Sequence, residues 1–174
     1  MTENDIKRQM MISSEIRNAI KNNIRDHGWH ACAVFPSEGD SSLPFCYTIG
    51  LTDMGMPEII LIGAIQPRFV HTIFSTLIEQ WKENGVKTGL NSDLIVDKNG
   101  NPICADIVEL NINGERLKGH YALQAYGHYG KDANKMRFVQ VHWPDMNGRL
   151  PTTEGFAMSE YTEILEPSAT KFEA

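Results

Sequence analysis

The sequence has few cysteines and none of the short motifs that identify a reaction at once. Its three cysteines are an odd number, and no two of them form a CxxC pair. This argues against a disulfide framework and against a structural zinc site. We therefore expect Cys32, Cys46 and Cys104 to be reduced and buried, with a nucleophilic role for one of them as the alternative. Glycine-rich phosphate loops, GxSxG elbows and HExxH helices are also absent from the sequence.

Long apolar runs and an excess of positive charge are missing as well. The longest apolar runs, such as 59–64, fall far short of the ~18 residues needed to cross a membrane. The first five residues, MTEND, lack the apolar core of a secretory signal. With 16 Lys+Arg against 22 Asp+Glu, the net charge of −6 disfavours duplex nucleic acid as a partner. We expect a cytoplasmic protein that binds neither membrane nor duplex nucleic acid.

The apolar periodicity predicts one α+β domain that spans all 174 residues. A helix is expected at 4–27, with Ser13 and Ser14 as a possible break. Its predicted apolar stripe consists of Ile6, Met10, Ile16, Ile20 and Ile24. A second helix opens at Pro67 and ends at Gly85. Residues 116–126 are predicted to form a third helix. The tail from Thr152 has no clear pattern, and we expect its last residues to be loose. The N-terminal and central helices are expected to pack on a mixed or antiparallel sheet. The strands of that sheet are predicted at 29–35, 45–51, 58–63, 93–97, 103–110 and 136–143, with a hairpin at Asn99-Gly100.

Several short segments occur in an order that resembles a known family. They are Gly28-Trp29-His30, the run PFCYTIGL at 44–51, MPEII at 56–60 and QVHWPD at 140–145, followed by Gly148-Arg149 and Pro151. Together they resemble a bacterial and phage family catalogued as domain of unknown function 4262, over roughly residues 20–156. The family commonly has a histidine where this chain has Met56, so an activity that needs this histidine would be missing here.

The resemblance implies no reaction, but it implies that certain polar positions cluster. These are Trp29, His30, Tyr47, Thr48, Glu58, Gln140, Trp143 and Asp145. For Glu58, at a strand start, and for Asp145, the residues alone leave a structural role and a ligand-anchoring role open. Asp145 precedes Asn147-Gly148, so it either caps that turn or acts as a base.

Four side chains are candidates for acid–base chemistry, if the protein has any. They are His30, Tyr47, His142 and Asp145. Each has a structural alternative, which for the histidines is a hydrogen-bonded core or surface position. No two of the six histidines have the spacing of a metal site on a helix or strand, so we predict neither a metal nor a cofactor.

A wider set of side chains is suited to hold a ligand. Tyr47 and Thr48 lead to Gly50, which permits close approach by a ligand or by another strand. Arg68 stands at a helix start, where an anion can bind. Tyr121, Tyr126, His128 and Tyr129 lie in an aromatic stretch that suits core packing, an interface or a planar ligand equally. The predicted ligand-binding residues are Trp29, His30, Tyr47, Thr48, Arg68, Tyr126, His128, Gln140 and Trp143.

These residues favour a protein that binds a small, planar, anionic ligand, such as a nucleotide or a nucleotide-derived signal. A phage-type protein that sequesters such a signal is one form of this hypothesis. A hydrolase that acts on a nucleotide-like substrate through His, Tyr and Asp is the first alternative. A protein-interaction module that docks through the N-terminal helix is the second. In each case we expect a homo-oligomer.

Overall fold

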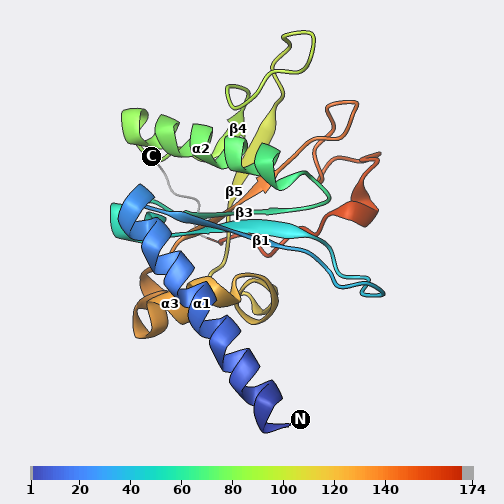
Figure 1. Cartoon of the computed structure of the whole chain (residues 1–174). Helices are drawn as coiled ribbons and strands as arrows, with labels where there is room; N and C mark the ends of the chain where they lie inside the picture. Colours follow the sequence, from blue (N-terminus) through green and yellow to red (C-terminus); the bar gives the residue numbers. More distant parts are fainter. Residues whose placement is uncertain (1, 170–174) are drawn as a thin grey trace.

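A computed structural model describes residues 2–169, and the side chains of residues 5–12 lie outside this description. Nine helices and strands organise the described chain (Figure 1). In chain order they are α1 (Glu3–His27), β1 (His30–Val34), β2 (Phe45–Ile49), β3 (Glu58–Ile62), α2 (Pro67–Asn84), β4 (Gly89–Asn91), β5 (Ala105–Glu109), α3 (Leu123–Tyr129) and β6 (Phe138–His142). A π-helical turn at Leu117–Tyr121 and short 3-10 turns at Leu51–Met54, Gly130–Lys135 and Ser159–Tyr161 complete them.

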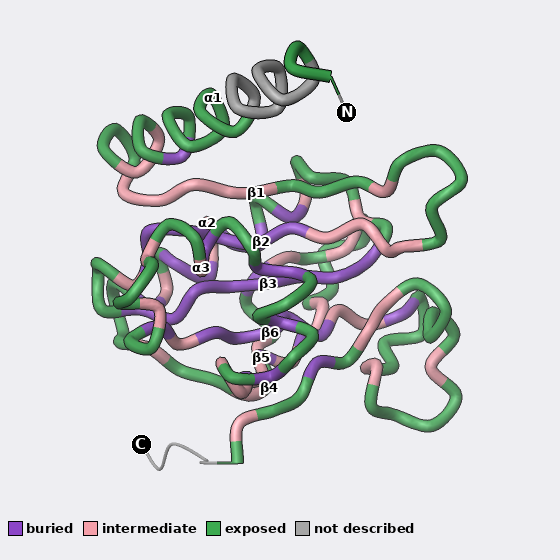
Figure 2. Tube along the Cα trace, turned by 90° about the horizontal axis from the view of Figure 1, so that it is seen from below, coloured by how far each residue is buried: buried purple, intermediate pink, exposed green. Residues whose placement is uncertain are grey.

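The strands form one six-stranded sheet in the order β1-β2-β3-β6-β5-β4. Only β3 and β6 run parallel, with Glu58 opposite Phe138, and the other neighbours are antiparallel. The sheet is therefore mixed, which confirms the predicted α+β class. The two central strands, β3 and β6, are buried along their whole length (Figure 2). The apolar run after Glu58 predicts this for β3, whereas the alternating pattern of β6 does not, and its Gln140 and His142 are buried as well.

Helices cover the two faces of the sheet and create two apolar clusters. On one face, α2 buries its stripe Val70, Ile73, Phe74, Leu77, Ile78 and Trp81. This stripe packs on Ile59, Leu61 and Val139 of the sheet. The opposite face carries Tyr47, Ile60 and Phe138, which pack with Ile20 of α1 and Ala125 of α3. Figure 1 shows α2 on one side of the strands and α3 on the other.

Helix α1 is continuous through Ser13 and Ser14, so the expected break at these serines is wrong. Among its described side chains, Ile20 is buried, Ile24 is half-buried and residues 13–19 are exposed. The predicted stripe also includes Ile6 and Met10, whose side chains lie outside the described residues. Within residues 2–169, none of the helices has the length and apolarity that crossing a membrane requires.

Two predicted segments differ from the structure for local reasons. The turn at Asn99-Gly100 forms, because the Asp97 carboxylate accepts the N–H groups of Asn99 and Asn101. Its predicted flanks pair at one bridge, Val96 with Pro102, where the N–H of Asp97 donates to the Asn101 carbonyl and that of Ile103 to the Ile95 carbonyl, but they form no longer ladder. The strand predicted at 93–97 is therefore wrong, and β4 at 89–91 pairs with β5 instead. The helix predicted at 116–126 is divided at Ala122, whose backbone leaves the helical region.

The C-terminal segment folds back onto the sheet although its sequence shows no period. Gln140 of β6 donates to the carbonyl of Glu163 at 2.6 Å and accepts the N–H of Leu165 at 3.0 Å. Leu165 is consequently buried, and Pro167 bridges to Leu110. The last residues of the tail, which were expected to be loose, include 170–174, and these lie outside the described residues.

Candidate functional site

Trp29 and His30 lie in a cleft of about 500 Å³ between the end of α1, the start of β1 and the outer face of α2. We call it the Trp29 cleft. Its lining comes from three elements and is mostly polar or aromatic. The lining residues are Asn23, His27, Trp29, His30, Ala31, His71, Ser75 and Glu79. Three of the six histidines of the chain therefore share one cleft.

Two glycines place Trp29 and His30 where they are. Gly28 ends α1 with a positive φ of 86°, as glycine does after a helix. Gly50, at the end of β2, lies against this turn: a Cβ on Gly50 would come within 2.7 Å of the Gly28 carbonyl oxygen and 3.0 Å of the Trp29 Cα. Gly50 was expected to permit close approach by a ligand or by another strand, and the structure shows that it permits close approach by the backbone at Gly28 and Trp29.

The indole of Trp29 stacks on the imidazole of His71. Their ring centroids are 5.0 Å apart and their planes differ by 22°. Trp29 is half-buried and packs on the cluster beneath α2, whereas His71 is exposed. Because one face of His71 rests on Trp29, its other face is open to a further planar group.

His30 is held in one orientation by α1. The side-chain amide nitrogen of Asn23 lies 2.8 Å from His30 Nδ1. With the amide as donor, Nδ1 accepts and the ring carries its proton on Nε2. Partial burial lowers the pKa of His30 below its ordinary value, which favours this neutral form at pH 7. His30 thus offers one N–H donor in a defined position.

The charge of the Trp29 cleft does not suit an anion. Glu79, which forms an ion pair with Lys82 at 2.9 Å, is the carboxylate among its lining residues, and no Arg or Lys belongs to the described lining. Ser75 Oγ donates to the His71 carbonyl oxygen at 2.8 Å, so its proton is already engaged. In the part of the chain that is described, no group of three or more His, Cys, Asp or Glu residues is arranged to hold a metal ion. The cleft therefore fits a neutral or amine-bearing planar group.

Glu58 and Thr48, which the resemblance places in one cluster, do meet, but within a closed network. Thr48 Oγ1 donates to Glu58 Oε2 at 2.6 Å. Glu58 Oε1 accepts from the backbone N–H of Gly50 and Thr52, the Thr52 hydroxyl and the Tyr129 hydroxyl. Burial raises the pKa of Glu58, and these donors oppose the rise. Since Glu58 is fully buried, the network joins β2, β3 and α3 rather than contacting a ligand.

Three other predicted site residues are engaged by the backbone. Tyr47 is buried in the core, and its hydroxyl accepts the N–H of Gln124 at 3.1 Å. Gln140 binds the C-terminal segment. Asp145 accepts N–H groups from Asn147, Arg149 and Ala157, each at 2.9 Å, and these bonds lower its pKa. Asp145 thus closes the turn, which was one of its two predicted roles.

The remaining candidates are dispersed. His142 is buried, and neither of its ring nitrogens has a hydrogen-bond partner within the described structure. Trp143 packs edge-on against Phe69, beside a separate apolar cavity of about 80 Å³. Arg68 is exposed at the start of α2, and Tyr126 donates to the carbonyl of Ile112. His128 lines a different cleft between α1 and α3. Of the predicted ligand-binding residues, only Trp29 and His30 share the Trp29 cleft.

Sequence reasoning missed most of the lining of the Trp29 cleft. His71, Ser75 and Glu79 recur every four residues along α2. This polar stripe was detectable, since residues four apart share a helix face. Asn23 and His27 show the same spacing near the end of α1. No sequence signal indicates that these two stripes face one another across Trp29.

Comparison with protein-family models matches residues 23–157 to a domain of unknown function, DUF4262. The chain belongs to this family. Every lining residue of the Trp29 cleft lies inside the matched range. Met56, where the resemblance leads one to expect histidine, is buried in the cluster beneath α2. Comparisons with curated proteins and with solved structures find no match.

Proposed function

We propose that this DUF4262 protein binds a small molecule with a planar, nitrogen-bearing ring, such as a nucleobase, in the Trp29 cleft. The observation that carries the proposal is the stack of Trp29 on the exposed imidazole of His71, because the face that Trp29 does not cover can accept a further planar group. Stacking of a base on an aromatic side chain contributes about 1–3 kcal/mol. The cleft volume of about 500 Å³ is also typical of small-molecule sites.

The polar groups around the stack suit a nucleobase better than a purely apolar ring. Glu79 Oε1 accepts from Lys82, and Oε2 is the oxygen that would accept from an exocyclic amine. His30 supplies the Nε2–H donor for a ring nitrogen or carbonyl. The ligand is recognised by its base, so a phosphate contributes little in this cleft. A nucleoside-like group is therefore the part of a nucleotide-derived ligand that the cleft recognises.

Binding without turnover is favoured over hydrolysis. Tyr47 and Asp145 are bound to backbone N–H groups and do not line the Trp29 cleft. His30 and His71 are then the acid–base groups left among the described lining residues. Ser75 Oγ lies 3.3 Å from His71 Nδ1, but its shorter bond of 2.8 Å to the His71 carbonyl oxygen engages the hydroxyl proton, which argues against activation of Ser75 by His71. Under this proposal the protein retains its ligand unchanged, as a sequestering protein does.

A thermal-shift panel tests the proposal. It contains adenosine, guanosine, cytidine and uridine, with ribose 5-phosphate as a ligand that lacks a base. A nucleoside at 100 times its Kd should stabilise the fold by about 2.7 kcal/mol, which is several degrees. Trp29→Leu should abolish the shift, whereas Trp143→Leu, which also replaces a half-buried indole, should preserve it. Mass spectrometry should recover the nucleoside intact; recovery of free base would instead indicate hydrolysis. A flat panel would reject the proposal.

A further inference from the structure

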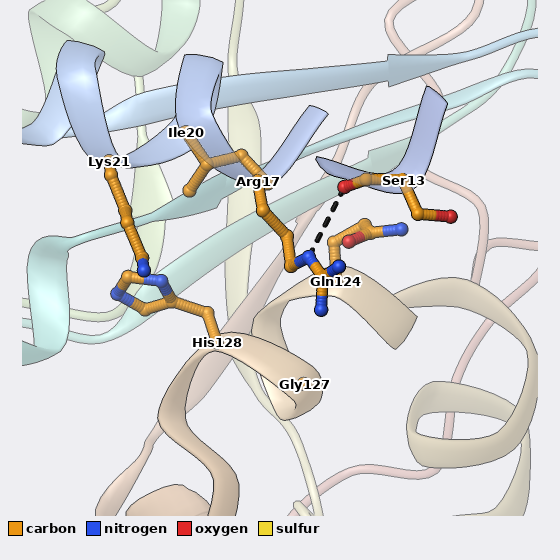
Figure 3. A pocket seen from close by; sticks show the side chains of 7 residues that line it. All are labelled: Ser13, Arg17, Ile20, Lys21, Gln124, Gly127 and His128. Atoms are coloured by element: carbon orange, nitrogen blue, oxygen red, sulfur yellow. Dashed lines mark hydrogen bonds between the residues drawn. The ribbon is translucent and has the colours of Figure 1, made fainter. Parts of the chain in front are cut away.

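A second cleft, of about 420 Å³, lies between α1 and α3 and has a different character. Its lining is basic and polar around one buried apolar residue, Ile20. We call it the basic cleft. The lining residues are Ser13, Arg17, Ile20, Lys21, Gln124, Gly127 and His128 (Figure 3). It lies on the α3 side of the sheet, away from the Trp29 cleft on the α2 side.

The cationic side chains converge from two elements. Figure 3 shows the Lys21 ammonium pointing from α1 toward the imidazole of His128 on α3, and the Arg17 side chain extending toward Gln124. Arg17 Nε donates to the carbonyl of Ser13, four residues earlier, at 3.2 Å. This bond steadies the guanidinium and leaves its terminal nitrogens as donors. Donors from both helices therefore face the same space.

The positive charge of the basic cleft is not balanced by a carboxylate. No acidic residue belongs to its described lining. Of the cations elsewhere in the described chain, five pair with Asp or Glu at 2.8–3.0 Å. Those cations are Arg25, Lys82, Arg116, Lys135 and Arg137. In a chain of net charge −6, two unpaired cations beside a histidine form a local site for an anion.

We propose that the basic cleft binds a small phosphate-bearing molecule of the diphosphate class. Arg17 is suited to bind phosphate oxygens in a bidentate manner, and Lys21 adds a point charge. The Ser13 hydroxyl and the Gln124 amide supply further neutral donors. Extended polyanions are disfavoured, because the cleft has the volume of a small-molecule site and the acidic chain repels a long phosphate backbone.

Only some of the residues that line the basic cleft lie inside the family domain. Ser13, Arg17, Ile20 and Lys21 precede residue 23, where the family match begins, whereas the α3 residues lie inside it. The anion site therefore depends on the N-terminal helix of this chain. A bound phosphate would join α1 to α3, so it should also slow amide exchange at residues 13–21.

Calorimetric titration of the full chain with inorganic pyrophosphate tests the proposal. The double variant Arg17→Gln/Lys21→Gln should weaken binding at least tenfold. The double variant Lys87→Gln/Lys98→Gln removes the same charge from exposed positions outside the basic cleft and should bind like the wild type. Both variants alter exposed side chains and should fold. Absence of pyrophosphate binding, or an equal loss in the two variants, rejects the site.

Two further experiments test whether the phosphate belongs to a small molecule, a nucleic acid or a membrane, and whether the two clefts bind independently. A single-stranded oligonucleotide or an anionic vesicle that binds while pyrophosphate does not would contradict a small-molecule site. Trp29→Leu should leave pyrophosphate affinity unchanged, and Arg17→Gln/Lys21→Gln should leave the nucleoside response unchanged. Failure of the Trp29 proposal is thus distinguishable from failure of this one.

Discussion

The Tyr129 hydroxyl donates a 2.8 Å hydrogen bond to Glu58 Oε1, which joins the end of α3 to the start of β3 across 71 positions. The Gly50 N–H is shared by both groups, at 3.1 Å to Glu58 and 2.9 Å to Tyr129. Because Glu58 is fully buried, its donors satisfy carboxyl oxygens that water cannot reach. This contact holds α3 against the sheet.

Glu58→Gln should destabilise the fold by more than about 2 kcal/mol, since the new amide nitrogen faces N–H and O–H donors that lose their acceptor. Tyr129→Phe removes one donor and should cost about 1–2 kcal/mol. Urea unfolding measures both changes. The exposed Glu154→Gln is the matched control and should have no effect. If Glu58→Gln leaves the free energy of unfolding unchanged, the proposed role of this network is wrong.

His142 should make the fold sensitive to mild acid. Burial lowers its pKa below the ordinary 6.5, although the Asp106 carboxylate opposes the change. At a pH between the pKa of His142 in the folded chain and its higher pKa in the unfolded chain, the unfolded chain binds more protons than the folded one. Stability is therefore lost as the pH falls below about 6.5, by up to about 1.4 kcal/mol per pH unit.

Substitution separates the His142 contribution from that of the other histidines. His142→Leu should flatten the slope of unfolding free energy against pH, and the exposed His120→Gln should not. Half-buried His30 contributes in the same direction, so some slope remains. An unchanged slope in His142→Leu would show that this side chain is not the source.

Gly50→Ala should disturb the Trp29 cleft. The added Cβ would lie 2.7 Å from the Gly28 carbonyl oxygen. The backbone φ of 117° at this position is also unfavourable for alanine. Gly39→Ala is the matched control, since its φ is 83° and no atom lies within 4 Å of its Cβ. The excess cost at Gly50, of about 1–3 kcal/mol, reports the close approach. Equal costs in a denaturant titration would contradict it.

Gln140→Ala should release the C-terminal segment. It removes the donor to Glu163 and the acceptor for Leu165, at about 1–3 kcal/mol. Hydrogen exchange at residues 163–168 should accelerate while α2 is unaffected. If those amides keep their protection, Leu165 and the Pro167 bridge hold the segment without Gln140.

Much of the fold was predictable because its elements carry their own signals. Pro67 and Gly85 bound α2, and the β-branched run of β3 indicates a buried strand. The π-helical turn at Leu117–Tyr121 and the return of Leu165 to the core have no local period, since tertiary contacts determine them. The Asn99-Gly100 turn forms as predicted, whereas the strand predicted before it is reduced to one bridge between Val96 and Pro102.

The candidate site was predictable only in part. Trp29 and His30 were found because they adjoin a helix end and begin a strand. His71 is 41 residues beyond His30, and only the packing of α2 on the sheet brings it over Trp29. Tyr and Gln often contact ligands, but the polar groups of Tyr47 and Gln140 form hydrogen bonds with the backbone instead. Burial and hydrogen-bond partners decide between these roles, and a single sequence encodes neither directly.

The indole N–H signals in a two-dimensional ¹H–¹⁵N spectrum test the central claim most directly. The signal of Trp29 is assigned with Trp29→Phe, and that of Trp81, whose N–H donates to the Lys87 carbonyl at 3.1 Å, is the internal reference. Adding adenosine or guanosine should shift the Trp29 signal in proportion to occupancy and leave the Trp81 signal in place. A nucleoside that binds without moving the Trp29 signal would contradict the account.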